Sequence, residues 1–150
     1  MRSLWWFTLP LLLLATGVAE TGSAASAPPE LFLTVRTDKP AYQSHEVIAI
    51  ALVVLNQGTS PLRLTTPTSQ QFDIYLCQNE QIVWRWSQGR MFAQALAQIV
   101  LEPAQPQIYV AKLDPKTLPA ALKPGPYQLV GLLRSNDNPR SKPWEITIRP

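Results

Sequence analysis

The amino-acid sequence predicts an all-β protein, an antiparallel sandwich of about 7–8 strands. Short apolar or alternating segments recur along the chain, and turn-forming residues separate them. The sequence contains 15 prolines, which interrupt helices and mark loops and strand ends. β-Branched residues dominate the longest apolar run of the mature part, residues 47–56, and such residues lose rotamer freedom in a helix. These observations together favour strands over helices.

The strands are expected in a regular order along the chain. Residues 31–37 alternate between apolar and polar side chains, and residues 47–56 are typical of a buried central strand. Residues 91–97 have a helix-favouring composition, but we interpret them as a loop that leads into a strand. The turn at 78–81 contains Glu80, which disfavours a tight type I′ turn. The further expected strands are 62–65, 72–77, 82–86, 98–102, 107–113, 126–134 and 144–149.

A late turn motif narrows the sandwich to an Ig-like type. Pro124, Gly125 and Tyr127 form a Pro-Gly-x-Tyr sequence before a predicted strand. In Ig-like sandwiches such a tyrosine anchors a corner through its hydroxyl group. We therefore expect one Ig-like domain over residues 28–150.

The first 27 residues have the layout of a secretory signal peptide. Arg2 precedes an apolar stretch that Pro10 interrupts, and small residues follow up to Ala27. The apolar stretch is shorter than the roughly 20 residues of a membrane-spanning helix. We therefore expect a signal-peptide helix over 1–27, cleavage after Ala27, no stable membrane anchor after cleavage, and a secreted or periplasmic product.

Composition argues against several classes of function. The net charge is +3, and the basic residues form no run of the kind that binds nucleic acid. The single histidine, His45, lies in a predicted turn, and no metal-ligand or nucleophile motif accompanies it. The single cysteine, Cys77, is interpreted as a half-buried apolar residue rather than a nucleophile. We expect no enzymatic activity, no metal, no cofactor and no nucleic-acid partner.

Three short segments carry the most specific pattern in the chain. The first is a strand, the second is a strand with two tryptophans, and the third follows a glycine-marked turn. Their marked residues are Gln70, Phe72 and Asp73, then Trp84, Arg85 and Trp86, then Phe92 and Gln94.

This pattern resembles the signature of the BsuPI-like bacterial intracellular proteinase inhibitors. That family has a Ser-Gln-x-Tyr/Phe-Asp strand, a Val-Trp-Arg-Trp-Ser strand and a Phe-x-Gln-Ala-Leu segment. The chain departs from related sequences at Glu80 and Ala104, where glycine is common. The resemblance implies a proteinase inhibitor with an Ig-like fold, and a serine protease as its partner.

The two tryptophans have two interpretations. They fill the sandwich core, or they form an exposed platform for a partner. We favour the core for at least one ring, because Ile82, Trp84 and Trp86 are expected on one apolar face. Arg85 is expected on the other face, paired with Asp73 across the hairpin.

Two loops are candidates for contact with a protease. The first contains Gln88, Gly89, Arg90 and Met91, and its basic residue fits an acidic specificity pocket. The second spans residues 114–119 and includes Lys116 and Leu118. The alternative function is a non-inhibitory, extracytoplasmic Ig-like module that binds a protein or another ligand. The sequence does not fix the oligomeric state.

Overall fold

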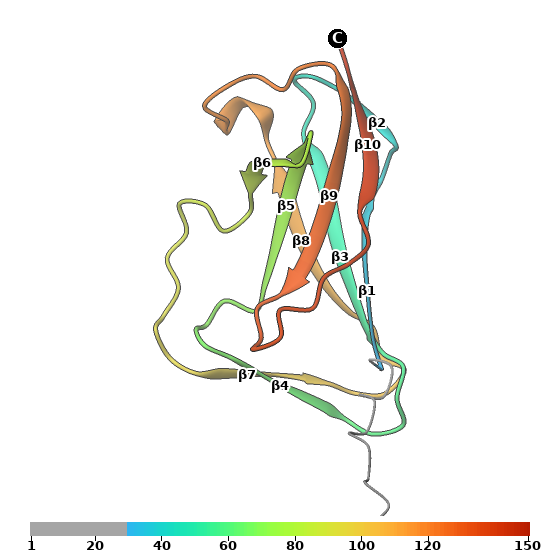
Figure 1. Ribbon diagram of the computed structural model, residues 1–150, viewed down its shortest axis with the longest axis vertical. Helices are drawn as coiled ribbons and strands as arrows, with labels where there is room; N and C mark the ends of the chain where they lie inside the picture. The colour runs from blue at the N-terminus through green and yellow to red at the C-terminus, as the bar shows by residue number, and fades with distance from the viewer. Residues whose placement is uncertain (1–29) are drawn as a thin grey trace, which may run out of the picture.

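A computed structural model of the protein describes residues 30–150, so the predicted signal peptide lies outside the described residues. The described chain forms ten β-strands and one short 3-10 helix (Figure 1). The elements are β1 (Leu31–Thr37), β2 (Ala41–Gln43), β3 (Ile48–Asn56), β4 (Leu62–Thr66), β5 (Phe72–Gln78), β6 (Gln81–Arg85), β7 (Ala97–Leu101), β8 (Gln107–Leu113), η1 (Pro115–Thr117), β9 (Gly125–Leu133) and β10 (Trp144–Arg149). Within residues 30–150, no helix is long and apolar enough to cross a membrane.

The strands form a two-layer sandwich and a separate ribbon. One layer has the order β1-β3-β8, and the other has the order β2-β10-β9-β5-β6. Neighbouring strands are antiparallel, except for the short β2, which pairs in parallel with β10. Strands β4 and β7 pair only with each other and lie below the sandwich in Figure 1. The predicted all-β, antiparallel Ig-like class is confirmed, with ten strands instead of 7–8.

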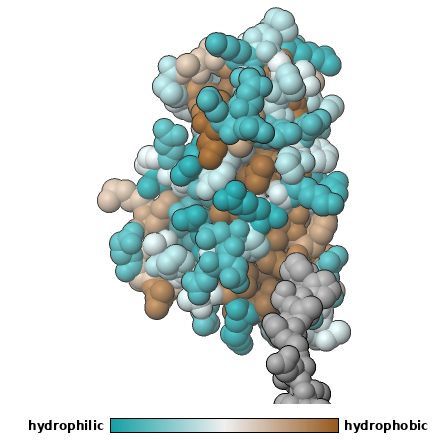
Figure 2. Space-filling view, viewed as in Figure 1, coloured by the Kyte–Doolittle hydropathy of each residue, from teal (hydrophilic) through white to brown (hydrophobic). Residues whose placement is uncertain are grey.

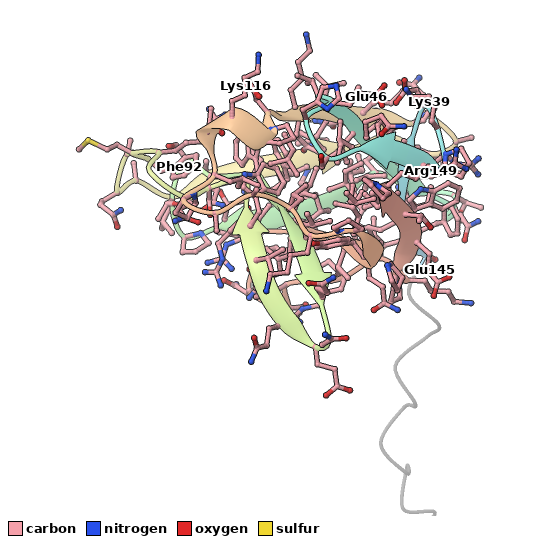
Figure 3. The ribbon with its side chains drawn as sticks, turned by 90° about the horizontal axis from the view of Figure 1, so that it is seen from above. Lys39, Glu46, Phe92, Lys116, Glu145 and Arg149 are labelled. Atoms are coloured by element: carbon pink, nitrogen blue, oxygen red, sulfur yellow. The ribbon has the colours of Figure 1, made fainter. Side chains whose placement is uncertain are left out.

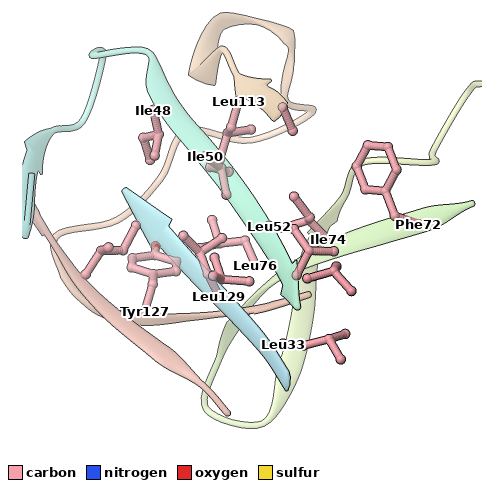
Figure 4. Packing of buried hydrophobic residues seen from close by; sticks show 14 of the residues in the cluster. Leu33, Ile48, Ile50, Leu52, Phe72, Ile74, Leu76, Leu113, Tyr127 and Leu129 are labelled. Carbon is pink, nitrogen blue, oxygen red and sulfur yellow. The ribbon is translucent and has the colours of Figure 1, made fainter. Parts of the chain in front are cut away.

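The core fills the space between the two layers. Along β3 every second residue is buried, as expected for a strand with one face on a core. Figure 4 shows these residues, including Ile50 and Leu52, facing Ile74 and Leu129 of the other layer. At Gly131 an added Cβ would lie 2.6 Å from a methyl group of Leu52, so a larger residue would force the facing side chains to shift. Tyr127 donates its hydroxyl hydrogen to the carbonyl of Lys123 (2.9 Å), as the Pro-Gly-x-Tyr motif predicted.

The hairpin of β5 and β6 differs from the prediction in two ways. Asn79 and Glu80 both have a left-handed backbone, with φ of 50° and 65°, so the tight turn forms despite Glu80. The register shifts between Leu76, which pairs with Trp84, and Cys77, which pairs with Ile82. The resulting bulge turns Ile82 to the face opposite Trp84, where it is 45% exposed. The predicted common face of Ile82, Trp84 and Trp86 is therefore wrong for Ile82.

Candidate functional site

The connection between β6 and β7, residues 86–96, extends away from the sandwich (Figure 1). It contains no strand or helix, which confirms the predicted loop for residues 91–96, whereas Ala97 already belongs to β7. Met91 is 98% exposed and Leu96 is 78% exposed. The side chains of a loop with such exposure contribute little to folding, so the contacts that hold the loop come from its two ends.

Asp73 of β5 fixes the start of this loop. Its side chain is 2% exposed, and one carboxylate oxygen accepts the backbone N–H of Ser87 at 3.0 Å. The other oxygen accepts the Ser87 hydroxyl at 2.6 Å. The backbone N–H of Trp86 also donates to the carbonyl of Ile74 at 2.9 Å. A buried carboxylate is stable only when such donors compensate its lost hydration.

The predicted pair between Asp73 and Arg85 is wrong. The register places Arg85 opposite Tyr75, and its guanidinium lies 4.7 Å from the centre of the Tyr75 ring. The donors to the Asp73 side chain instead come from Ser87 and from the adjacent backbone N–H of Ile74.

Ser69 fixes the other end of the segment. Its backbone N–H donates to the carbonyl of Ala93 at 3.0 Å, and its hydroxyl oxygen accepts the backbone N–H of Ala93 at 2.9 Å. Gln70 is buried and donates to the carbonyl of Phe72, whereas Gln94 is exposed beyond the anchor. Segment 87–93 is therefore held at both ends by serine and aspartate side chains of one short stretch, 69–73.

A row of aromatic rings supports the base of the loop. The rings of Trp86 and Phe72 are stacked with centroids 4.1 Å apart, and Phe72 stacks on Tyr109 at 4.6 Å. The ring of Phe92 lies 6.0 Å from Trp86, and Figure 3 shows Phe92 on the loop side of the molecule. The Tyr109 hydroxyl donates to Gln71, and burial raises the pKa of Tyr109 to about 12. Trp84 and Trp86 are half-buried and pack against the core, as predicted for at least one of them.

The turn at the tip places Arg90 and Met91 differently. Gly89 has a φ of 76°, and the backbone N–H of Arg90 donates to the carbonyl of Ser87 at 3.0 Å. The Arg90 side chain folds back: its Nε donates to the carbonyl of Trp86 at 3.0 Å, and its guanidinium lies 4.4 Å from the Trp86 ring centre. Met91 has almost all of its surface in solvent. The predicted basic contact residue is thus engaged within the loop, while its neighbour is free.

The second candidate loop lies against the body of the protein. Asp114 caps η1 by accepting the backbone N–H of Lys116 at 3.0 Å. Leu118 packs against the core, so it does not project toward a partner. Lys116 is exposed and is labelled in Figure 3.

Sequence reasoning assigned no role to three residues that build the site, Ser69, Ser87 and Tyr109, although the two serines belong to the family's strand motifs. The two serines stand at the ends of the marked segments, next to residues that were singled out. Their place beside a predicted loop was the available signal, since serine commonly bonds nearby backbone groups. Tyr109 gave no signal, because its contact with Phe72 joins distant parts of the chain.

Metal and nucleophile chemistry finds no support in the described part of the chain. Residues 30–150 contain no group of three metal-ligating side chains. His45 is exposed. Cys77 is half-buried, and burial raises the pKa of its thiol, which disfavours the reactive thiolate.

Comparison with protein families gives one match. The family BsuPI, described as intracellular proteinase inhibitor, matches residues 35–138, which is more than half of the chain. Among the curated proteins, no sequence matches this one. The family description contradicts the predicted secreted or periplasmic location, because it points to an inhibitor that stays inside the cell. That prediction was wrong.

Comparison with solved structures concerns the fold alone. The sporulation control protein Spo0M from Bacillus subtilis is 12% identical, with a TM-score of 0.50 over 80% of this chain and 49% of that one. A CARDB domain from Pyrococcus furiosus is 10% identical, with a TM-score of 0.46 over 79% of this chain and 94% of that one. A β-glucosidase from Erythrobacter marinus is 13% identical, with a TM-score of 0.47 over 79% of this chain. The present chain spans only 15% of that enzyme.

Proposed function

The chain belongs to the BsuPI family of proteinase inhibitors, and we propose that it inhibits a serine protease by placing segment 87–93 in the active-site cleft. The observation that carries this proposal is the double anchoring of an exposed loop. Asp73 holds Ser87, and Ser69 holds Ala93. A loop that is already fixed loses little conformational entropy on binding, and this favours tight association with a cleft.

Met91 is the central contact residue in this proposal. It is 98% exposed, and it lies between the anchored Arg90 and Phe92. Its side chain is apolar, flexible and uncharged, so it fits a specificity pocket lined by apolar groups. Arg90 instead stiffens the turn through its contacts with Trp86. The expected target therefore prefers apolar residues at the cleavage site.

The test is an inhibition assay against serine proteases with basic, apolar and small-residue preferences. Met91→Asp should raise the inhibition constant at least about thirtyfold, because loss of a central anchor costs about 2 kcal/mol or more. Leu96→Asp is the matched control, since Leu96 is also exposed and apolar but lies beyond the Ser69 anchor. It should change inhibition less than about threefold.

Two results would contradict the proposal. Loss of inhibition in Lys116→Ala, with Met91→Asp unchanged, would move the contact to the loop at 114–119. Absence of inhibition by the unmodified protein across all protease classes would leave a non-inhibitory binding module as the function.

A further inference from the structure

The outer face of the three-stranded sheet carries an open groove of about 810 Å³. Its floor is formed by two small residues of the central strand, Ala49 and Ala51 of β3. Ala51 pairs with Arg36 on one side and Val110 on the other, and Ala49 pairs with Lys112. The face is hollow here because short side chains on the central strand lie between longer ones on the flanking strands.

Basic side chains stand on both sides of the largely apolar groove. Arg36 lies on one side, and Lys112 and Arg90 lie on the other. One acidic residue, Asp38, also lines the groove, and its carboxylate accepts a hydrogen bond from the Tyr42 hydroxyl. Within residues 30–150 the ion pair is that of Lys39 and Glu46, so none of the three basic residues has an acidic partner. Arg90 is engaged with Trp86, so the groove offers mainly Arg36 and Lys112 to an anionic occupant, and its lining has two more basic than acidic residues.

The same face is apolar along its length. Val110 is 74% exposed, Ile108 is 57% exposed and Phe32 is 44% exposed. Alternation along β1 and β8 places these residues on the outer side, away from the core. Exposed apolar groups rimmed by charges are typical of surfaces that bind another protein. For comparison, Figure 2 shows the surface seen from the direction of Figure 1, where hydrophilic side chains are spread over much of the molecule.

We propose that this groove binds an extended acidic segment of a partner protein. An occupant with carboxylates near its ends and apolar side chains between them would pair with the basic walls and cover the alanine floor. Arg36 and Lys112 stand on strands β1 and β8, two strand spacings apart, which is roughly 10 Å across the sheet. This span suits a peptide that crosses the strands. A small ligand fits less well, because such ligands bury most of their surface in enclosed pockets.

The groove adjoins the loop through Trp86 and the folded-back side chain of Arg90, but it does not include Met91. The inference goes beyond protease inhibition, because it stands on the sheet face and its charges. Variants of Met91 and variants of the groove therefore separate the two functions.

The test uses the peptide Ac-ELDVLE-amide as the probe, with Ac-KLKVLK-amide of equal length for comparison. Binding is measured by NMR titration of the labelled protein at low and physiological salt. We expect the acidic peptide to shift amide signals of β1, β3 and β8 around the groove, with affinity that falls as salt rises. The double variant Arg36→Glu/Lys112→Glu should weaken binding at least tenfold.

The matched control is Arg63→Glu/Lys123→Glu, which makes the same charge change at exposed sites outside the groove. It should retain nearly all of the affinity, and Met91→Ala should do the same. Equal binding of the acidic and basic peptides, or equal losses in the two double variants, would overturn the proposal. Signal shifts confined to other faces would also overturn it. Dodecanoate, a fatty acid, tests the alternative of a lipid ligand, and its binding without binding of the acidic peptide would overturn the proposal as well.

Discussion

Ala104 offers a test of the backbone at the corner between β7 and β8. It has a left-handed conformation with φ of 57°, and its side chain is exposed. Its N–H donates to the carbonyl of Asn56 at 3.0 Å, so the position ties the end of β3 to this corner. Replacement of Ala104 by glycine keeps this hydrogen bond and loses no buried surface.

Ala104→Gly should therefore stabilise the protein. The left-handed region costs an L-residue roughly 1–2 kcal/mol, and glycine avoids this cost. Glycine in turn has a more flexible unfolded state, which costs about 0.5–1 kcal/mol relative to alanine. The net gain should be about 0.5–1 kcal/mol, equivalent to a rise in Tm of about 2–5 °C for a domain of this size.

The assay is urea denaturation of wild type and variant, with thermal unfolding as a second measure. Ala120→Gly is the matched control, because Ala120 is exposed and does not have a positive φ. This control should destabilise the protein by about 0.5–1 kcal/mol. If Ala104→Gly lowers the free energy of unfolding as much as Ala120→Gly does, the strain argument is refuted.

Three further predictions concern the loop anchors, Trp84 and Tyr109. Asp73→Ala should lower the free energy of unfolding by about 3 kcal/mol, and Ser87→Ala should lower it by about 1–2 kcal/mol. Both changes remove hydrogen bonds to a buried carboxylate. If the losses simply add in the double variant, the two residues do not act together and the anchor assignment is contradicted. Trp84→Ala should cost roughly 2 kcal/mol in urea denaturation, less than for a fully buried ring, and a loss below about 1 kcal/mol would place it outside the packing. The raised pKa of Tyr109 means that the unfolded chain loses its proton first, so stability should fall as pH rises from about 10 to about 12. Because the ring is only partly buried and solvent screens its charge, the fall should be about 1 kcal/mol. Tyr109→Phe should lack this part of the fall, and an identical pH profile would contradict the assignment.

Periodicity predicted most of the strands because a strand with one face on a core repeats every two residues. Segments 31–37, 107–113 and 144–149 have the same bounds in the sequence prediction and in the structure. The short β2 was missed, since three residues after a proline carry too little pattern. The separate β4–β7 ribbon was also not predicted, because pairing between strands distant in sequence is a tertiary property.

The site was harder to predict than the fold. Alternation assigned Ile82 to the face of Trp84, but a single bulge reversed it. Simple charge pairing assigned Asp73 to Arg85, although the backbone donor and hydroxyl of Ser87 lie closer to the carboxylate than any cation does. Arg90 was expected to project, whereas stacking on Trp86 holds it against the loop. Each error arose where a local feature, a bulge, a hydrogen bond or a ring contact, outweighed a general rule of periodicity or charge.

The polar side chains that anchor the loop are not of the kind that the sandwich core requires. A sandwich core needs apolar side chains on β5, and Phe72, Ile74 and Leu76 supply them. Asp73 is buried among them, and burial of a carboxylate is unfavourable unless its hydrogen bonds are satisfied. Two of its hydrogen bonds come from Ser87, at the start of an exposed loop. The same stretch also holds Ala93 through Ser69. The main role of its polar residues is therefore to set the shape of segment 87–93, and they contribute less to the packing of the two sheets.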